Sequence, residues 1–158
     1  MKIAVYGPLC NERSKSTIKV LIKYLKNRNA DVFFEKNFYE SIVTDSNIEI
    51  ESFQFETFKS LDTSFDLLIS VGGDGTILRA ITYVKNLNIP IVGINTGRLG
   101  FLATIPMTTV EKALDEIFEG NYRISKRSLL SITIDGDQNE SELNFALNEI
   151  SVSRKNTT

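Results

Sequence analysis

The sequence has no histidine and only one cysteine, Cys10, among its 158 residues. Without histidine there is no imidazole general base, no Ser-His-Asp triad and no histidine metal ligand. A single cysteine forms no internal disulfide and builds no cysteine-rich zinc site, so Cys10 is interpreted as an inert thiol. These absences exclude several classes of enzyme and metalloprotein, and they favour the reducing cytoplasm as the expected compartment.

Long apolar runs and a charge excess are also missing. No run approaches the roughly 20 apolar residues of a membrane span, and the first residues lack the pattern of a signal peptide. The chain carries 18 basic and 20 acidic residues. The net charge of −2 provides no electrostatic attraction for nucleic acid. We therefore expect no membrane and no nucleic-acid partner. The length suits one globular domain, or one and part of a second.

Strands and helices are predicted to alternate over the first hundred residues. Apolar runs predict strands at residues 2–6, 31–35, 65–71 and 90–94. Apolar residues at helical spacing predict helices at residues 16–27 and 77–84, and residues 38–43 could form a short helix. Residues 48–55 alternate imperfectly and stay unassigned. Strands that alternate with helices indicate a parallel α/β sheet.

The pattern changes after residue 100. Thr108 and Glu111 have the spacing of a capping box at the start of a helix that Gly120 would stop. Strands are then predicted at 122–126, 129–135 and 143–153, with a hairpin turn at 135–137. We expect an α/β nucleotide-binding domain at 1–102 and the opening of a β-rich, sandwich-like domain at 103–158. Because so short a hairpin has little core, we expect a longer parent protein or a partner chain.

Residues 72–76, Gly-Gly-Asp-Gly-Thr, are the sharpest motif in the sequence. They join an apolar strand to a helix, and ligands bind at the carboxyl ends of such strands. Gly72, Gly73 and Gly75 leave backbone N–H groups uncovered beside a helix N-terminus, which suits phosphate. Asp74 would then lie beside the phosphates, where a carboxylate can hold magnesium or take a proton from an attacking hydroxyl.

Each candidate site also has a plainer interpretation. Gly72–Thr76 could be a turn whose glycines serve only geometry; it matches neither the dinucleotide fingerprint nor the P-loop. Residues 95–102, Asn-Thr-Gly-Arg-Leu-Gly-Phe-Leu, suit a close backbone approach or an interdomain turn equally. Arg79 could reach a bound phosphate or lie on a solvated helix face. Asn148 and Glu149 interrupt an apolar strand, and edge-strand solvation is their plainer explanation.

In this order, the three motifs at 72–76, 95–102 and 147–149 resemble those of the NAD kinase family. The first motif is shared with lipid kinases, whereas the second is much more specific. The resemblance implies transfer of the terminal phosphate of ATP, or of polyphosphate, to the 2′-hydroxyl of the adenosine ribose of NAD, giving NADP. Magnesium, or another divalent cation, would bridge the donor phosphates, and no side chain of the chain is assigned as a metal ligand.

The resemblance also implies a role for each candidate residue. Asp74 would accept the proton of the hydroxyl, and Gly75 would lie against NAD. Gly72 and Gly73 would help hold the phosphoryl donor. Arg79 would lie near NAD or the phosphates, and Asn148 and Glu149 would bind NAD through its ribose or adenine. A neighbouring subunit commonly completes the site, so a homodimer or homotetramer is expected.

One departure from the family pattern matters. The family continues into a further motif, Thr-Pro-Thr-Gly-Ser-Thr-Ala-Tyr, that these 158 residues lack. We therefore expect the 158 residues alone to be inactive or nearly so. Two rival functions stay open: a diacylglycerol-type lipid kinase that shares only residues 72–76, and a non-catalytic nucleotide-binding module.

Overall fold

The computed structural model describes residues 1–45, 55–131, 145–147 and 149–151, and it forms two compact units, Met1–Tyr122 and Arg123–Thr158. In the second unit, β7 (Leu130–Ser131) pairs antiparallel with β8 (Phe145–Ala146). The predicted strand at 122–126 is wrong, because these residues form no regular element. The predicted turn at 135–137 lies outside the described residues. The domain boundary expected after residue 102 stays a prediction.

A parallel sheet forms the centre of the first unit, as the alternating pattern predicted. Its described strands run in the order β3-β2-β1-β4-β5-β6, and every neighbouring pair is parallel. The strands are β1 (Lys2–Tyr6), β2 (Asp31–Glu35), β3 (Glu56–Phe58), β4 (Leu67–Val71), β5 (Ile91–Asn95) and β6 (Ile105–Pro106). The expected α/β class is confirmed. The short edge strands β3 and β6 are the two that the apolar pattern missed.

Four α-helices accompany this sheet in the described residues of the first unit. They are α1 (Glu12–Asn27), α2 (Lys36–Val43), α3 (Asp74–Val84) and α4 (Val110–Phe118), the last preceded by a 3-10 turn, Met107–Thr109. Helix α1 begins four residues before its predicted start, because Asn11 and Ser14 form a reciprocal capping box.

The predicted limits of α4 are right at one end only. The capping box expected at Thr108 and Glu111 is wrong, since the N-cap is Thr109 and its side chain makes no capping hydrogen bond. At the other end Gly120 has a φ of +79°, and its N–H donates to the carbonyl of Ile117. A residue in this left-handed conformation ends a helix, as predicted for Gly120.

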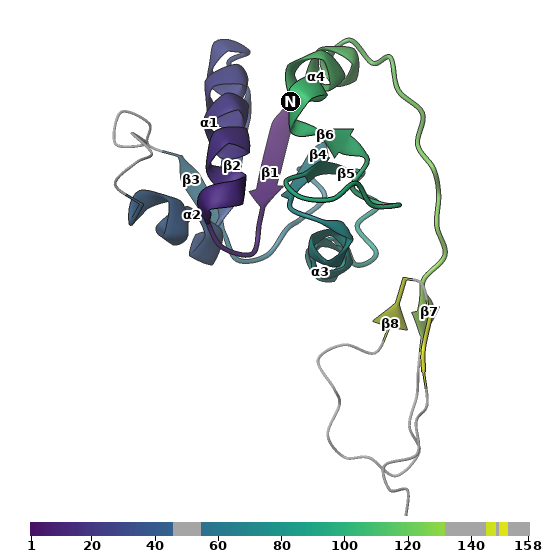
Figure 1. Cartoon of the computed structure of the whole chain (residues 1–158). Helices are drawn as coiled ribbons and strands as arrows, with labels where there is room; N and C mark the ends of the chain where they lie inside the picture. The colour runs from purple at the N-terminus through teal and green to yellow at the C-terminus, as the bar shows by residue number, and fades with distance from the viewer. Residues whose placement is uncertain (46–54, 132–144, 148, 152–158) are drawn as a thin grey trace, which may run out of the picture. The chain divides into compact units, whose positions relative to one another are not determined.

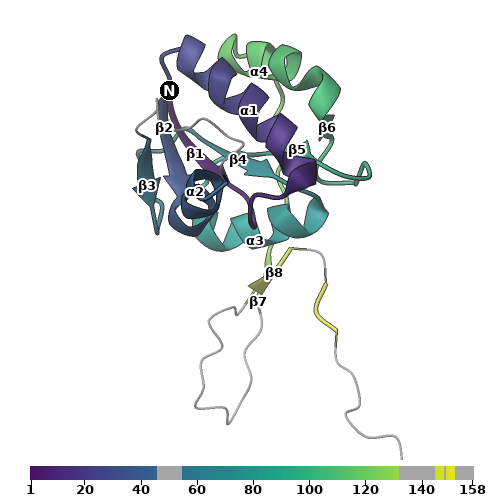
Figure 2. The same ribbon diagram turned by 60° about the vertical axis from the view of Figure 1, so that its left-hand side comes forward.

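The two faces of the sheet carry separate cores. Alternate residues of a strand point to opposite faces. Ile3 and Val5 of β1 pack in the cluster that contains α1, α2 and α4, whereas Ala4 and Tyr6 pack in the cluster that contains α3. Figures 1 and 2 show α1 and α4 together on one side of the strands and α3 on the other.

A polar contact joins α1 to α4. The hydroxyl of Tyr24 donates to Oδ1 of Asp115 at 2.6 Å, and Arg28 pairs with the same carboxylate. The Tyr24 hydroxyl, followed by Arg28, holds the pKa of the Asp115 carboxyl below its ordinary value.

This contact predicts a pH dependence of stability. A carboxyl whose pKa is lowered by folding contributes stability above its unfolded pKa, about 3.9, and loses it as the pH falls through the folded value. We expect Asp115→Asn to lower the free energy of unfolding by more at pH 7 than at about pH 3. Urea unfolding at the two pH values measures this; an equal gap at both would contradict it.

The strand order also locates the point at which ligands bind in such sheets. From β1 the chain continues outward to β2 and β3, then returns to β4 and continues to β5 and β6 on the other side. The order therefore reverses between β1 and β4, and ligands bind in the crevice at the carboxyl ends of the strands there. Gly7 and Gly72 directly follow these two strands.

Candidate active site

The turn after β4 places the Gly-Gly-Asp-Gly-Thr motif at the carboxyl ends of the strands. All five residues of β4 are buried. The N–H of Gly72 donates to the carbonyl of Ile94 in the neighbouring β5 at 2.9 Å, so the prediction that this N–H is uncovered is wrong. A Cβ on Gly72 would lie 2.1 Å from Oγ1 of Thr76, so a side chain has no room there. Gly73 caps α3, and Asp74 is its first residue.

The carboxylate of Asp74 is bound by three backbone N–H groups from a distant loop. Phe101 N–H donates to Oδ2 at 2.8 Å, while Leu102 and Ala103 N–H donate to Oδ1 at 3.0 and 2.9 Å. These bonds, that of Ala103 first, hold the pKa of the Asp74 carboxyl below its ordinary value. The group is therefore ionised at neutral pH, because hydrogen bonds to the charged form favour it.

This loop leaves β5 and returns to β6, and it is fixed at its base by Asn95. Asn95 is buried, and its Nδ2 donates to the carbonyls of Arg98 and Ala103 at 2.9 and 3.1 Å. Its Oδ1 accepts the N–H of Gly97 at 2.7 Å. The returning chain packs closely on β5, since a Cβ on Gly93 would lie 2.7 Å from Cα of Ala103. The loop is thereby held beside the start of α3.

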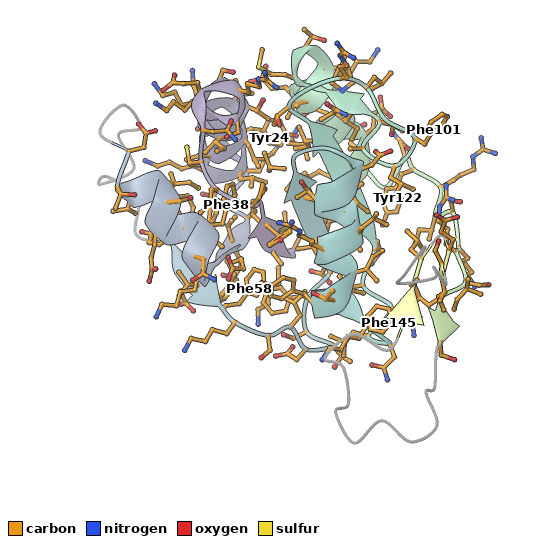
Figure 3. All side chains as sticks on the ribbon, turned by 60° about the horizontal axis from the view of Figure 1, so that its bottom comes forward. Tyr24, Phe38, Phe58, Phe101, Tyr122 and Phe145 are labelled. Carbon is orange, nitrogen blue, oxygen red and sulfur yellow. The ribbon has the colours of Figure 1, made fainter. Side chains whose placement is uncertain are left out.

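The two glycines of this loop have different surroundings. A Cβ on Gly100 would lie 2.2 Å from Oδ1 of Asp74, whereas one on Gly97 would meet only Asn95 Oδ1 at 3.9 Å. The close approach predicted for residues 95–102 is therefore found at Gly100. The next side chain, Phe101, is 94% exposed and points away from the helices in Figure 3.

Arg79 lies on a different side of α3 from Asp74. Five residues at about 100° each separate the two by roughly 140° around the helix axis. The Arg79 guanidinium lies beside the Tyr6 hydroxyl at the end of β1, where it opposes the rise that burial causes in the Tyr6 pKa. The structure thus directs Arg79 toward the end of β1 and directs Asp74 toward the loop. A role for Arg79 in binding NAD or phosphate stays a prediction.

The remaining predicted residues differ in how far the structure describes them. A Cβ on Gly73 or Gly75 would meet nothing within 4 Å, so open space lies above the backbone on either side of Asp74. Glu149 is exposed in the second unit, and Asn148 lies outside the described residues. Residues 95–102 were singled out as a motif, but no role toward Asp74 was predicted for Asn95, for Gly100 or for the three N–H donors. The glycines at 97 and 100 indicated only that something approaches this loop closely.

A cavity of about 420 Å³ lies beside this loop, and neither Asp74 nor Arg79 lines it. Its walls come from the first turns of α1, from the end of β5 and the loop after it, and from the end of β6 and the 3-10 turn that follows. They are Glu12, Arg13, Ser16, Thr17, Asn95, Thr96, Gly97, Leu99, Pro106 and Met107. Among the described residues no three acidic or cysteine side chains gather as metal ligands would. No helix in those parts of the chain is long and apolar enough to cross a membrane.

Comparison with known proteins identifies the family of the chain. Residues 7–122 match the ATP-NAD kinase N-terminal domain. The chain belongs to the NAD kinase family. NAD kinases of Flavobacterium psychrophilum and Christiangramia forsetii are 46% and 45% identical to it over its whole length. The NAD kinase of Porphyromonas gingivalis is 31% identical over 99% of the chain. The chain spans about half the length of these relatives, 52% to 54%.

Proposed function

We propose that the protein containing this chain is an NAD kinase that transfers the terminal phosphate of ATP to the 2′-hydroxyl of the adenosine ribose of NAD. The observation that supports this most is the carboxylate of Asp74, ionised and bound by three backbone N–H groups at the carboxyl end of β4. The family match and the whole-chain similarity to NAD kinases supply the substrates of the proposal.

In the proposed reaction the 2′-oxygen forms a bond to the terminal phosphorus as the bond to ADP breaks. The proton of the hydroxyl passes to Oδ2 of Asp74, which accepts one N–H in the structure. A carboxylate of lowered pKa is a weak base, so it mainly orients the hydroxyl and takes the proton late. Such transfer depends on positioning and charge neutralisation more than on covalent chemistry.

The binding roles follow the open surfaces of the motif. Gly73 would hold the donor phosphates, since it offers no side chain to cap the first N–H groups of α3. Gly72, whose N–H already donates to Ile94, would help hold them by shaping the turn. Gly75 would lie against NAD, with Arg79, Asn148 and Glu149 as its further contacts. Mg²⁺ would arrive on the phosphates of ATP and neutralise their charge, as magnesium usually does at such sites.

Four further properties belong to the proposal. The cytoplasm is the proposed compartment, and a homodimer or homotetramer is the proposed assembly. We propose no membrane and no nucleic-acid partner. The isolated 158 residues are expected to make little or no NADP.

The acceptor decides between this function and its rivals. Protein at the length that the cell makes would be incubated with Mg²⁺, γ-labelled ATP and an equimolar mixture of NAD and diacylglycerol. We expect label in NADP and none in lipid. Label in lipid would favour the lipid kinase, and label in neither product, from a folded protein that binds ATP, would favour the binding module.

A further inference from the structure

We propose that residues 100–103 are the positioning element of Asp74, with Gly100 as the residue that admits the carboxylate and Asn95 as the residue that fixes the loop. The effect of this element on NADP formation rests on the proposed function. Its effect on the carboxylate does not, because the contacts are present in the chain without any substrate.

The loop occupies most of the hydrogen-bond acceptor positions of the Asp74 carboxylate. An ionised carboxylate has about four lone-pair positions, and the loop occupies three of them. Leu102 and Ala103 saturate Oδ1, whereas Phe101 takes one position of Oδ2. One position on Oδ2 remains for a ligand. The loop therefore fixes both the oxygen and the direction with which Asp74 can meet a hydroxyl.

Contacts at both ends of Ala103 connect Asn95 to this arrangement. The N–H of Ala103 donates to Asp74, and its carbonyl accepts from Nδ2 of Asn95. Asn95 is 4% exposed, so losing one of its three hydrogen bonds can leave a buried polar atom of its own side chain unpaired. Asn95 thus acts on the carboxylate through the loop and without touching it.

Backbone groups rather than charged side chains keep Asp74 ionised. Arg79 is the next cation along α3 and lies beside Tyr6, and Arg98 contacts Asn95 through its carbonyl. Neither contributes to the lowered pKa of Asp74, whose causes are the three N–H groups opposed by burial. Moving the loop away should therefore raise that pKa, because no charge on α3 or on the loop replaces the lost bonds.

The test compares Gly100→Ala with Gly97→Ala in protein of the length that the cell makes. Both changes add one methyl group to the same loop, but only the first would collide with Asp74. For Gly100→Ala we expect kcat to fall at least about tenfold, the acid limb of kcat/KM to move to higher pH, and NAD affinity to change by less than about threefold. Gly97→Ala should match the wild type in all three.

Amide hydrogen exchange provides a measurement that does not depend on the reaction. The amides of residues 101–103 should exchange at least about tenfold faster in Gly100→Ala than in the wild type and Gly97→Ala. Asn95→Asp removes the two hydrogen bonds that Nδ2 donates and should also speed the exchange of these amides. If Gly100→Ala does not fold, the exchange measured in Asn95→Asp tests the proposal. Unchanged exchange in the folded variants would overturn the proposal. Absence of NADP from the wild type would instead refute the proposed function, and exchange would still decide the positioning.

Discussion

Replacing Asp74 with asparagine is expected to lower the rate of NADP formation by about 10²- to 10⁴-fold, the range that a positioned proton acceptor contributes. Asparagine keeps the size of the side chain but cannot take the proton. It also has one acceptor oxygen and one NH₂ group. Both oxygens of Asp74 accept loop N–H groups, so the NH₂ group of asparagine faces a donor in either orientation. It faces the N–H of Phe101 in one orientation and the N–H groups of Leu102 and Ala103 in the other.

The measurement is kcat for NADP formation together with the dissociation constant for NAD. Asp31→Asn is the matched control. Asp31 is exposed and is the first residue of β2, so it lies at the amino ends of the strands, whereas Asp74 lies at their carboxyl ends. We expect Asp74→Asn to lose turnover while NAD affinity changes by less than about tenfold, and Asp31→Asn to lose neither. Turnover within about threefold of the wild type would refute the role of Asp74.

The largest expected loss of stability comes from Phe34→Ala. Phe34 is 1% exposed, and its ring lies 5.0 Å from that of Phe55 and about 6 Å from those of Phe38 and Tyr39. Truncating a buried phenylalanine to alanine removes its transfer free energy and leaves a cavity, at a cost of about 3–5 kcal/mol. Typical domains have a free energy of unfolding of about 5–15 kcal/mol, so this one change removes a large part of it.

Phe101→Ala is the control for this prediction, because it makes the same substitution at a side chain that is 94% exposed. It keeps the Phe101 N–H that binds Asp74, and its effect on stability should lie within about 0.5 kcal/mol. Urea unfolding of the two variants measures the difference. Equal midpoints would mean that the aromatic cluster around Phe34 contributes little to the fold.

The sequence predicted the elements that carry a continuous local signal. Strands β1 and β2 have the predicted limits, and β4 and β5 begin or end within two residues of theirs. These segments are apolar because both faces of a parallel sheet are covered. The edge strands β3 and β6 contain only three and two residues, too few to form a pattern.

The partners of the key carboxylate could not be predicted in the same way. The motif at Asp74 was recognisable, since three glycines at a strand end have a local physical reason. Its donors lie 27 to 29 residues away, and the sequence has no signal that pairs a side chain with backbone groups at that distance. Gly100 showed that something approaches the loop closely; only the structure shows that the approaching group is Asp74.

The position of the transferred phosphate tests the central claim most directly. Protein of the length that the cell makes would be given MgATP and NAD, and the dinucleotide product would be analysed by phosphorus NMR with Asp74→Asn in parallel. The proposed reaction predicts a new phosphate on the 2′-oxygen of the adenosine ribose with the wild type, and almost none with the variant. A phosphate at another position of NAD, or equal 2′-phosphate from both proteins, would contradict it.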